Sequence, residues 1–232
     1  MAQPGQPAAK RRKLDLFEEV VVVVGSQEHR FTVPKCFLTK TSDFFKTCLN
    51  GTWKEAKDKT VKLPKQEPGI FAVYLQWLYT GDLILCEATP EDLKDKPHED
   101  RQSAALEHYG LLVPLAILAD SLADSMLSNV VVDAILRVKY NMHFAPGPDQ
   151  VRRAYGNLPE NSPLKRLLVD MYLYDVGVAF VERIKASLPN DFVFDLMIAA
   201  KNVASSSGKG SKSYCQEKCR YHVHTDNVPK CT

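Results

Sequence analysis

The sequence predicts an α+β fold followed by an all-helical extension and a flexible tail that contains cysteine and histidine. Three observations support this prediction. Short β-branched or alternating runs lie between residues 20 and 63, and apolar residues then recur at helical spacing as far as residue 200. Residues 205–213 contain only Ser, Gly and Lys, which is typical of a flexible linker. We therefore divide the chain into 1–15, 16–126, 127–204 and 205–232.

The first predicted strand is residues 20–24, an unbroken valine run that suits a strand buried on both faces. Gly25-Ser26 predicts a hairpin turn, after which residues 30–33 alternate between polar and apolar. Residues 60–63 alternate in the same way, and Pro64 blocks their extension. We expect this third run to be an exposed edge strand.

Short helices are predicted between and after these strands. Pro34 supplies the φ of a first helical position, and Ser42 is the expected N-cap of a second short helix that stops at Asn50-Gly51. Pro68 opens a longer helix that Gly81 terminates. This longer helix places several apolar residues on one face: Phe71, Tyr74, Leu75 and Leu78.

In this order, the elements resemble the BTB/POZ family over residues 16–126. The overall layout is most similar to fungal stand-alone BTB proteins. The resemblance implies a small mixed sheet flanked by a cluster of helices, and a protein-binding module without catalytic apparatus. One departure is Pro34, where many members have histidine. The resemblance depends on the Val-Gly hairpin, Phe31-Thr32-Val33, Ser42-Asp43-Phe44-Phe45, Trp77-Leu78-Tyr79-Thr80-Gly81, and the Leu-Ala-Asp within residues 111–122.

The resemblance also implies a partner surface. Adaptor members of the family bind a cullin partly through an apolar-x-Glu triplet just after the second short helix, and here that place holds Trp53, Lys54 and Glu55, with Phe45 in the helix before it. A tryptophan flanked by lysines in a loop is expected to be partly exposed and to serve as an interface anchor. The alternative is that Trp53 folds back onto the helix beneath it and Glu55 is merely solvated.

The resemblance bears on oligomeric state as well. BTB proteins that form swapped homodimers carry an extra helix ahead of the first strand. Here about fifteen residues rich in Pro, Gln and Lys precede that strand, and they do not form an amphipathic helix. A swapped homodimer is therefore not expected.

Residues 87–108 are polar and predict a solvated loop, with one helical turn starting at Thr89-Pro90. Helices are predicted over residues 129–141 and from Ser162-Pro163 onward. We expect their apolar stripes to be core, the alternative being a helical extension that completes a groove for a partner. The last stripe consists of Val193, Leu196, Met197 and Ala200.

The net charge of +2 is unevenly distributed, with basic residues in excess at both ends of the chain and acidic residues in excess between them. Residues 1–15 carry four basic and one acidic side chain, and residues 201–232 carry six basic and two acidic ones. The part between them holds 20 basic and 25 acidic residues, so specific nucleic-acid binding by the body is not expected, although the tails could make weak contact with polyanions.

The N-terminal basic run resembles a monopartite nuclear import signal, which implies an import receptor as partner and a nuclear location. Such signals bind as an extended strand whose basic stems lie on stacked tryptophans of the receptor. The alternative is a solvated basic arm and a cytoplasmic protein. The residues concerned are Lys10, Arg11, Arg12 and Lys13.

The tail concentrates five potential zinc ligands within 17 residues: Cys215, Cys219, His222, His224 and Cys231. Zinc prefers four nitrogen or sulfur ligands in a tetrahedral array. The spacing lacks paired two-residue knuckles, so two alternatives stay open. The tail is either disordered or docked on the body through Tyr214 and Tyr221. No other cofactor is required.

The sequence shows no catalytic constellation or phosphate loop, and its longest uncharged apolar stretch, 11 residues, is too short to span a membrane. We therefore predict a nuclear protein-interaction module and not an enzyme, in particular a substrate adaptor for a cullin ubiquitin ligase. The alternative is a transcriptional regulator that contacts nucleic acid or corepressors through its tail.

Overall fold

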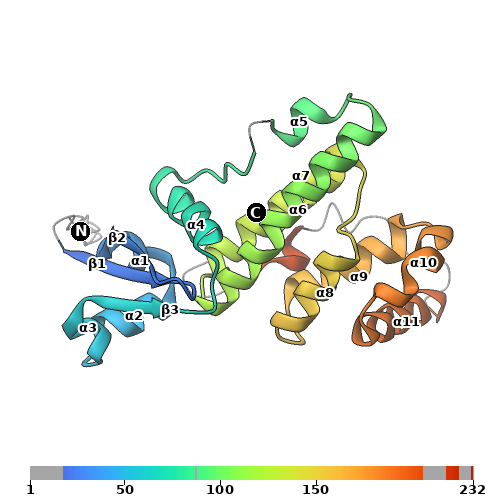
Figure 1. The fold of residues 1–232 in the computed structure, drawn as a ribbon. Helices are drawn as coiled ribbons and strands as arrows, with labels where there is room; N and C mark the ends of the chain where they lie inside the picture. The colour runs from blue at the N-terminus through green and yellow to red at the C-terminus, as the bar shows by residue number, and fades with distance from the viewer. Residues whose placement is uncertain (1–17, 87, 206–217, 225–230, 232) are drawn as a thin grey trace, which may run out of the picture.

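The computed structural model describes residues 18–86, 88–205, 218–224 and 231. Figure 1 shows the strands and first helices at one end, a long pair of helices through the middle, and the remaining helices at the other end. The elements in chain order are β1 (Glu19–Val24), β2 (His29–Pro34), α1 (Lys35–Thr41), α2 (Asp43–Asn50), α3 (Lys54–Asp58), β3 (Thr60–Leu63), α4 (Pro68–Thr80), α5 (Pro90–Leu93), α6 (His98–Ser121), α7 (Ser125–Met142), α8 (Pro148–Asn157), α9 (Pro163–Asp175), α10 (Val178–Ile184), η1 (Lys185–Ser187), α11 (Asn190–Ser205) and η3 (Lys218–Tyr221).

The three strands form one mixed sheet in the order β2-β1-β3. β1 is antiparallel to β2 and parallel to β3, which confirms the small mixed sheet and the edge position of β3. The central position of β1 explains its unbroken valines, because Val20, Val22 and Val24 are all at most 1% exposed. Gly25 begins the hairpin turn with φ +78°, a conformation that favours glycine.

The predicted helix boundaries of this region are confirmed, with one exception. The Ser42 hydroxyl accepts from the Phe45 N–H at 3.1 Å to cap α2 and donates to the Leu122 carbonyl at 2.6 Å. Pro68 opens α4, and Gly81 ends it with φ +81°. The prediction that Pro34 takes the first helical position is wrong. Its ψ of 127° is extended, so Pro34 is the last residue of β2 and the helix begins one residue later.

The polar segment between α4 and α6 is shorter than predicted. Thr89 caps α5 through a capping box with Asp92, so the predicted helical turn is confirmed. The prediction of a loop as far as residue 108 is wrong, because α6 already begins at His98 and runs for 24 residues. Its first turn is charged and outward, whereas Ala105 and Tyr109 are buried. Because the residues of that outer face are polar, the sequence pattern indicated a loop where the first turns of α6 lie.

Helices α6 and α7 pack side by side and carry the core from the sheet into the helical extension (Figure 1). The stripes predicted around residues 129–141 and after Ser162 are core. The stripe at the end of the extension is not: Val193 is 44% and Met197 46% exposed. α11 packs on α9 mainly through Phe192, whose ring lies 4.9 Å from that of Tyr172. As the last helix of the extension, α11 is covered along one side.

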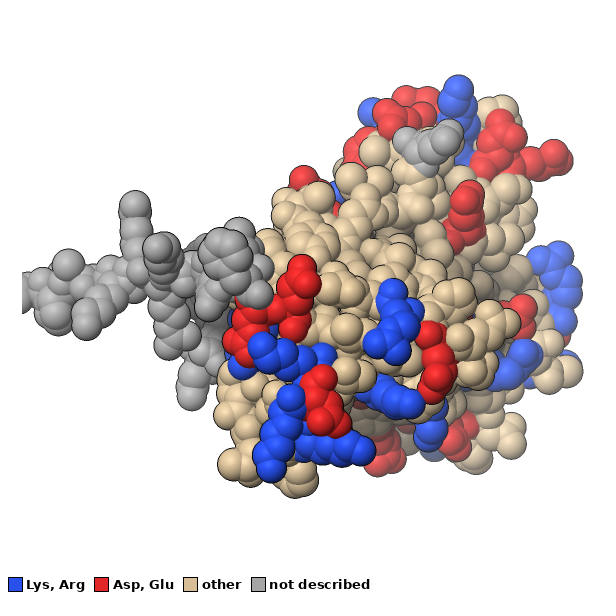
Figure 2. Space-filling view, turned by 60° about the vertical axis from the view of Figure 1, so that its left-hand side comes forward, with Lys and Arg blue, Asp and Glu red and all other residues tan. Residues whose placement is uncertain are grey.

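Charges of both signs are interleaved on the surface. Figure 2 shows Lys and Arg side chains lying among Asp and Glu side chains on one face. Exposed pairs such as Lys62 with Glu28, 2.9 Å apart, follow this pattern and contribute little to stability. Among the helices of the described residues, none combines the length and apolar character that a membrane span requires.

Candidate functional site

Trp53 lies in the connection between α2 and α3, directly before the first residue of α3. Its side chain is 63% exposed, which confirms the predicted exposure. The indole lies close to Gly51, where a Cβ would come within 2.7 Å of Trp53 Cδ1. Because Gly51 has no side chain, one edge of the Trp53 ring can lie against the backbone of Gly51 while the rest of the ring is exposed to water.

The residues after Trp53 form the short helix α3. Lys54 is exposed and Glu55 is partly buried. α3 packs on α2, so Glu55 lies near Cys48. Burial raises the pKa of the Cys48 thiol, and the Glu55 carboxylate raises it further. α3 ends at Asp58, and the following Lys59 has a left-handed backbone and caps the helix by donating its N–H to the Glu55 carbonyl. Trp53 and Lys54 thus present an apolar surface beside a positive charge.

Phe45 does not belong to this surface. Its side chain is 0% exposed and packs edge-to-face on Phe44, with ring centroids 5.3 Å apart. The prediction that Phe45 contacts a partner is therefore wrong, because the ring is part of the core. The neighbouring Phe44 is only partly buried. The basic residues Lys10 to Lys13 of the predicted import signal lie outside the described residues.

The C-terminal tail returns to the helical extension at η3. Tyr221 is 0% exposed, and its hydroxyl donates to the Asp170 carboxylate of α9. The Val223 N–H donates to Asn129 Oδ1 of α7 at 2.7 Å, and Asn129 Nδ2 donates back to the Val223 carbonyl at 3.0 Å. Of the two alternatives to a metal site, docking through Tyr221 is thus observed, whereas Tyr214 lies outside the described residues.

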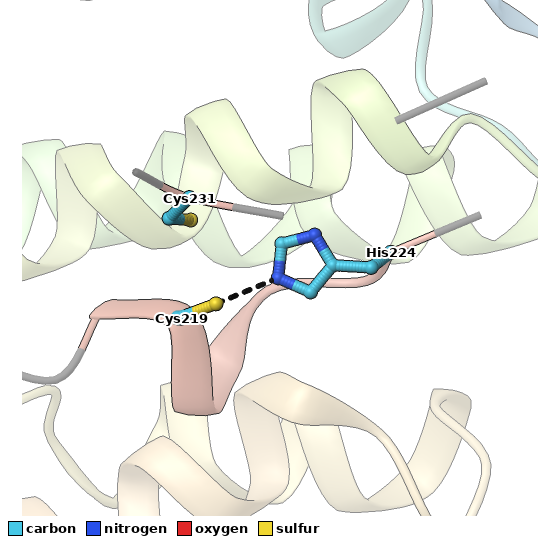
Figure 3. A group of neighbouring side chains, drawn as sticks. All are labelled: Cys219, His224 and Cys231. Carbon is cyan, nitrogen blue, oxygen red and sulfur yellow. Dashed lines mark hydrogen bonds between the residues drawn. The ribbon is translucent and has the colours of Figure 1, made fainter. Parts of the chain in front are cut away.

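Three predicted ligands come together in this tail (Figure 3). The donor atoms of Cys219, His224 and Cys231 all lie within 4.8 Å of one another. Cys219 Sγ and His224 Nε2 are 3.0 Å apart, and the imidazole points at the sulfur. Two thiols and an imidazole are ligands that zinc accepts, so this group is able to hold a metal ion. Cys215 lies outside the described residues.

His222 borders the group. Its Nδ1 lies 3.0 Å from Cys231 Sγ, and its Nε2 lies 3.4 Å from Asp133 Oδ1 of α7. The sequence identified His222 but not the residues that hold the tail. Asn129, Asp133 and Asp170 lie on other helices, so no local spacing connects them with the ligands. The sequence did offer one signal for this docking site: Asp170 is an acidic residue within the apolar stripe of α9, and such a buried carboxylate needs a hydrogen-bonding partner.

Comparison with known proteins agrees with this fold. Residues 9–98 match the family model described as the BTB/POZ domain. Kelch-like protein 40a of Danio rerio is 28% identical over 80 residues, which cover 34% of this chain and 13% of that protein. The match therefore spans a small part of the relative's length. Together with the mixed sheet and its helices, these findings show that the chain carries a BTB/POZ domain, a protein-interaction module, followed by a mostly helical region.

Proposed function

We propose that this protein recruits other proteins through its BTB/POZ domain, and that one partner is a cullin scaffold bound at Trp53, Lys54 and Glu55. The observation that carries the proposal is the 63% exposure of the Trp53 side chain. Burying such a ring in a partner removes a large apolar area from water, and tryptophan is prominent among residues that dominate interface energies. The position of the triplet in the domain supports the adaptor role, and the partial match to a Kelch-like protein is consistent with it.

The variant Trp53→Ala tests this proposal. We expect it to weaken cullin binding by about 30-fold, the effect of losing roughly 2 kcal/mol at an interface centre. The measurement is the dissociation constant between the purified chain and a purified cullin. Tyr140→Ala is the matched control, because Tyr140 is a 74% exposed aromatic on α7 and should leave binding unchanged. Failure of the wild type to bind any cullin, or equal binding by Trp53→Ala, would refute the adaptor role.

We also propose that the basic run Lys10 to Lys13 directs the protein to the nucleus through an import receptor. Four consecutive cationic side chains offer the stems and charges that such receptors recognise. Replacing all four with alanine should move a fluorescent fusion of the full chain from nucleus to cytoplasm. An unchanged distribution would refute the signal.

Nucleic-acid contact through the tail is the alternative function, and the structure gives it less support. Arg220 lies 3.1 Å from Asp170, so its charge is partly compensated. Salt-dependent binding to duplex DNA that is lost on deleting residues 205–232 would support the alternative over the adaptor role.

For the tail group we propose zinc as the bound ion. Cys219, His224 and Cys231 supply sulfur and nitrogen donors, which zinc prefers over the oxygen ligands typical of calcium or magnesium. Native mass spectrometry of the full chain should show one zinc ion per molecule. Cys231→Ser should lose it and Cys36→Ser, a change in α1 outside the group, should keep it. Absence of the adduct from the wild type would refute zinc binding.

A further inference from the structure

The described part of the tail is a short segment that docks on α7 and α9 through a buried tyrosine and a small set of polar contacts. η3 and the three residues after it are held by Tyr221 and Arg220 on Asp170, by Arg166 on the Arg220 carbonyl, and by Val223 on Asn129. Ordering each residue of such a segment opposes docking, because its backbone loses conformational freedom. An additional linkage between tail residues and the body would make the docked arrangement much more stable.

His222 is placed to provide that linkage. Its side chain is 8% exposed and lies between Cys231 Sγ on the Nδ1 side and Asp133 Oδ1 on the Nε2 side. The 3.4 Å between Nε2 and Asp133 Oδ1 is a close approach and not a hydrogen bond in this structure. In metal sites, a ligating histidine commonly donates its other ring N–H to a carboxylate, which fixes the tautomer and the ring orientation. If Nε2 carries the proton toward Asp133, Nδ1 is free to ligate an ion. Nδ1 lies beside Cys231 Sγ, one of the three grouped donors, although His222 itself stands at the edge of that group.

We infer that zinc bound by Cys219, His222, His224 and Cys231 clamps the tail onto the helical extension, with His222 as the fourth ligand and Asp133 as its hydrogen-bond acceptor. The inference rests on the proposal that the tail group binds zinc. Four such donors complete the tetrahedral set that is usual for structural zinc. Because Asp133 belongs to α7 and the acceptor of Tyr221 belongs to α9, the ion stabilises a tail segment that bridges two helices.

Hydrogen exchange of the full chain, with zinc and after its removal by a chelator, measures the clamp. With zinc, we expect the Val223 amide to be protected, because it donates to Asn129. Chelation should reduce that protection by roughly tenfold or more, since the ion's binding free energy stabilises the docked segment. Amides in the centre of β1 serve as an internal control and should be unchanged.

Two pairs of variants define the ligands. His222→Ala should lose zinc, whereas Cys215→Ser should keep it. Asp133→Asn should weaken zinc affinity by about 10–100-fold while one ion still binds at saturation, because it removes the carboxylate behind His222. The Asp133 side chain is 36% exposed, so this change should leave α7 folded. Asp175→Asn, a change of the same kind at a carboxylate on α9, should leave zinc affinity unchanged.

The outcomes separate the two proposals. If the wild type binds no zinc, both zinc binding and the clamp are refuted. If zinc binds but chelation leaves the Val223 amide equally protected, the clamp alone is refuted. If Cys215→Ser loses zinc and His222→Ala keeps it, the assignment of His222 as fourth ligand is wrong.

Discussion

Replacing Phe45 with alanine is expected to lower the free energy of unfolding by about 3–5 kcal/mol. The ring is 0% exposed and belongs to the core of the BTB/POZ domain, so its removal takes apolar area out of the core and leaves a cavity. Equilibrium unfolding in urea, followed by circular dichroism, gives this free energy difference.

Trp53→Ala is the matched control, since it removes a larger aromatic ring from the loop that follows the same helix. Because Trp53 is mostly exposed, its stability effect should stay within about 0.5 kcal/mol. The pair thus separates core from contact surface. A Phe45→Ala protein with unchanged stability but weakened cullin binding would show that Phe45 belongs to the partner surface after all.

Asp124→Ala is expected to have a comparable cost, again about 3–5 kcal/mol. The Asp124 carboxylate is 1% exposed and caps α7 by accepting the Leu127 N–H at 3.0 Å. It also accepts from the Thr41 hydroxyl and, at 3.3 Å, from the Tyr74 hydroxyl. Alanine leaves these donors without their acceptor. Thermal unfolding should show the loss, whereas alanine at the exposed Asp58 should not change stability by more than about 0.5 kcal/mol.

The same carboxylate affects stability as a function of pH. Burial raises the pKa of Asp124, although the hydrogen bonds from Leu127, Thr41 and Tyr74 oppose the shift. A group whose pKa is higher in the folded than in the unfolded protein stabilises the fold below its unfolded pKa, and this contribution is lost as the pH rises through the folded pKa. Asp124→Asn should remove that component, and a pH profile of unfolding that is identical in both proteins would contradict this account.

Local signals predicted the elements whose ends are chemically marked. Pro68 and Gly81 bound α4, and Ser42 caps α2, because these residues act on the backbone where they stand. The start of α6 was missed because its first turns are charged on the side that faces water. The exposed stripe of α11 was misassigned because helical spacing reveals an apolar face but not whether another helix covers it.

The same distinction applies to the two sites. Lysines around Trp53 correctly predicted its exposure. Phe45 lies four residues before the buried Leu49, so helical spacing alone would have placed it on the inner face of α2. The docking of the tail was beyond local reasoning, since Tyr221 and Val223 find their acceptors on helices many residues earlier in the chain.

The packing of α7 on α6 determines where the chain can be truncated without unfolding the domain. Ser42 bonds to Leu122 and Thr41 to Asp124, so the first helices are tied to the very connection that leads into the extension. A truncation after residue 126 would remove α7 from the face of α6 on which it packs. The apolar residues of α6 would then be exposed to water, and we expect the truncated protein to aggregate. The folded unit that contains the BTB/POZ domain therefore extends beyond the domain itself and includes the first turns of the helical extension.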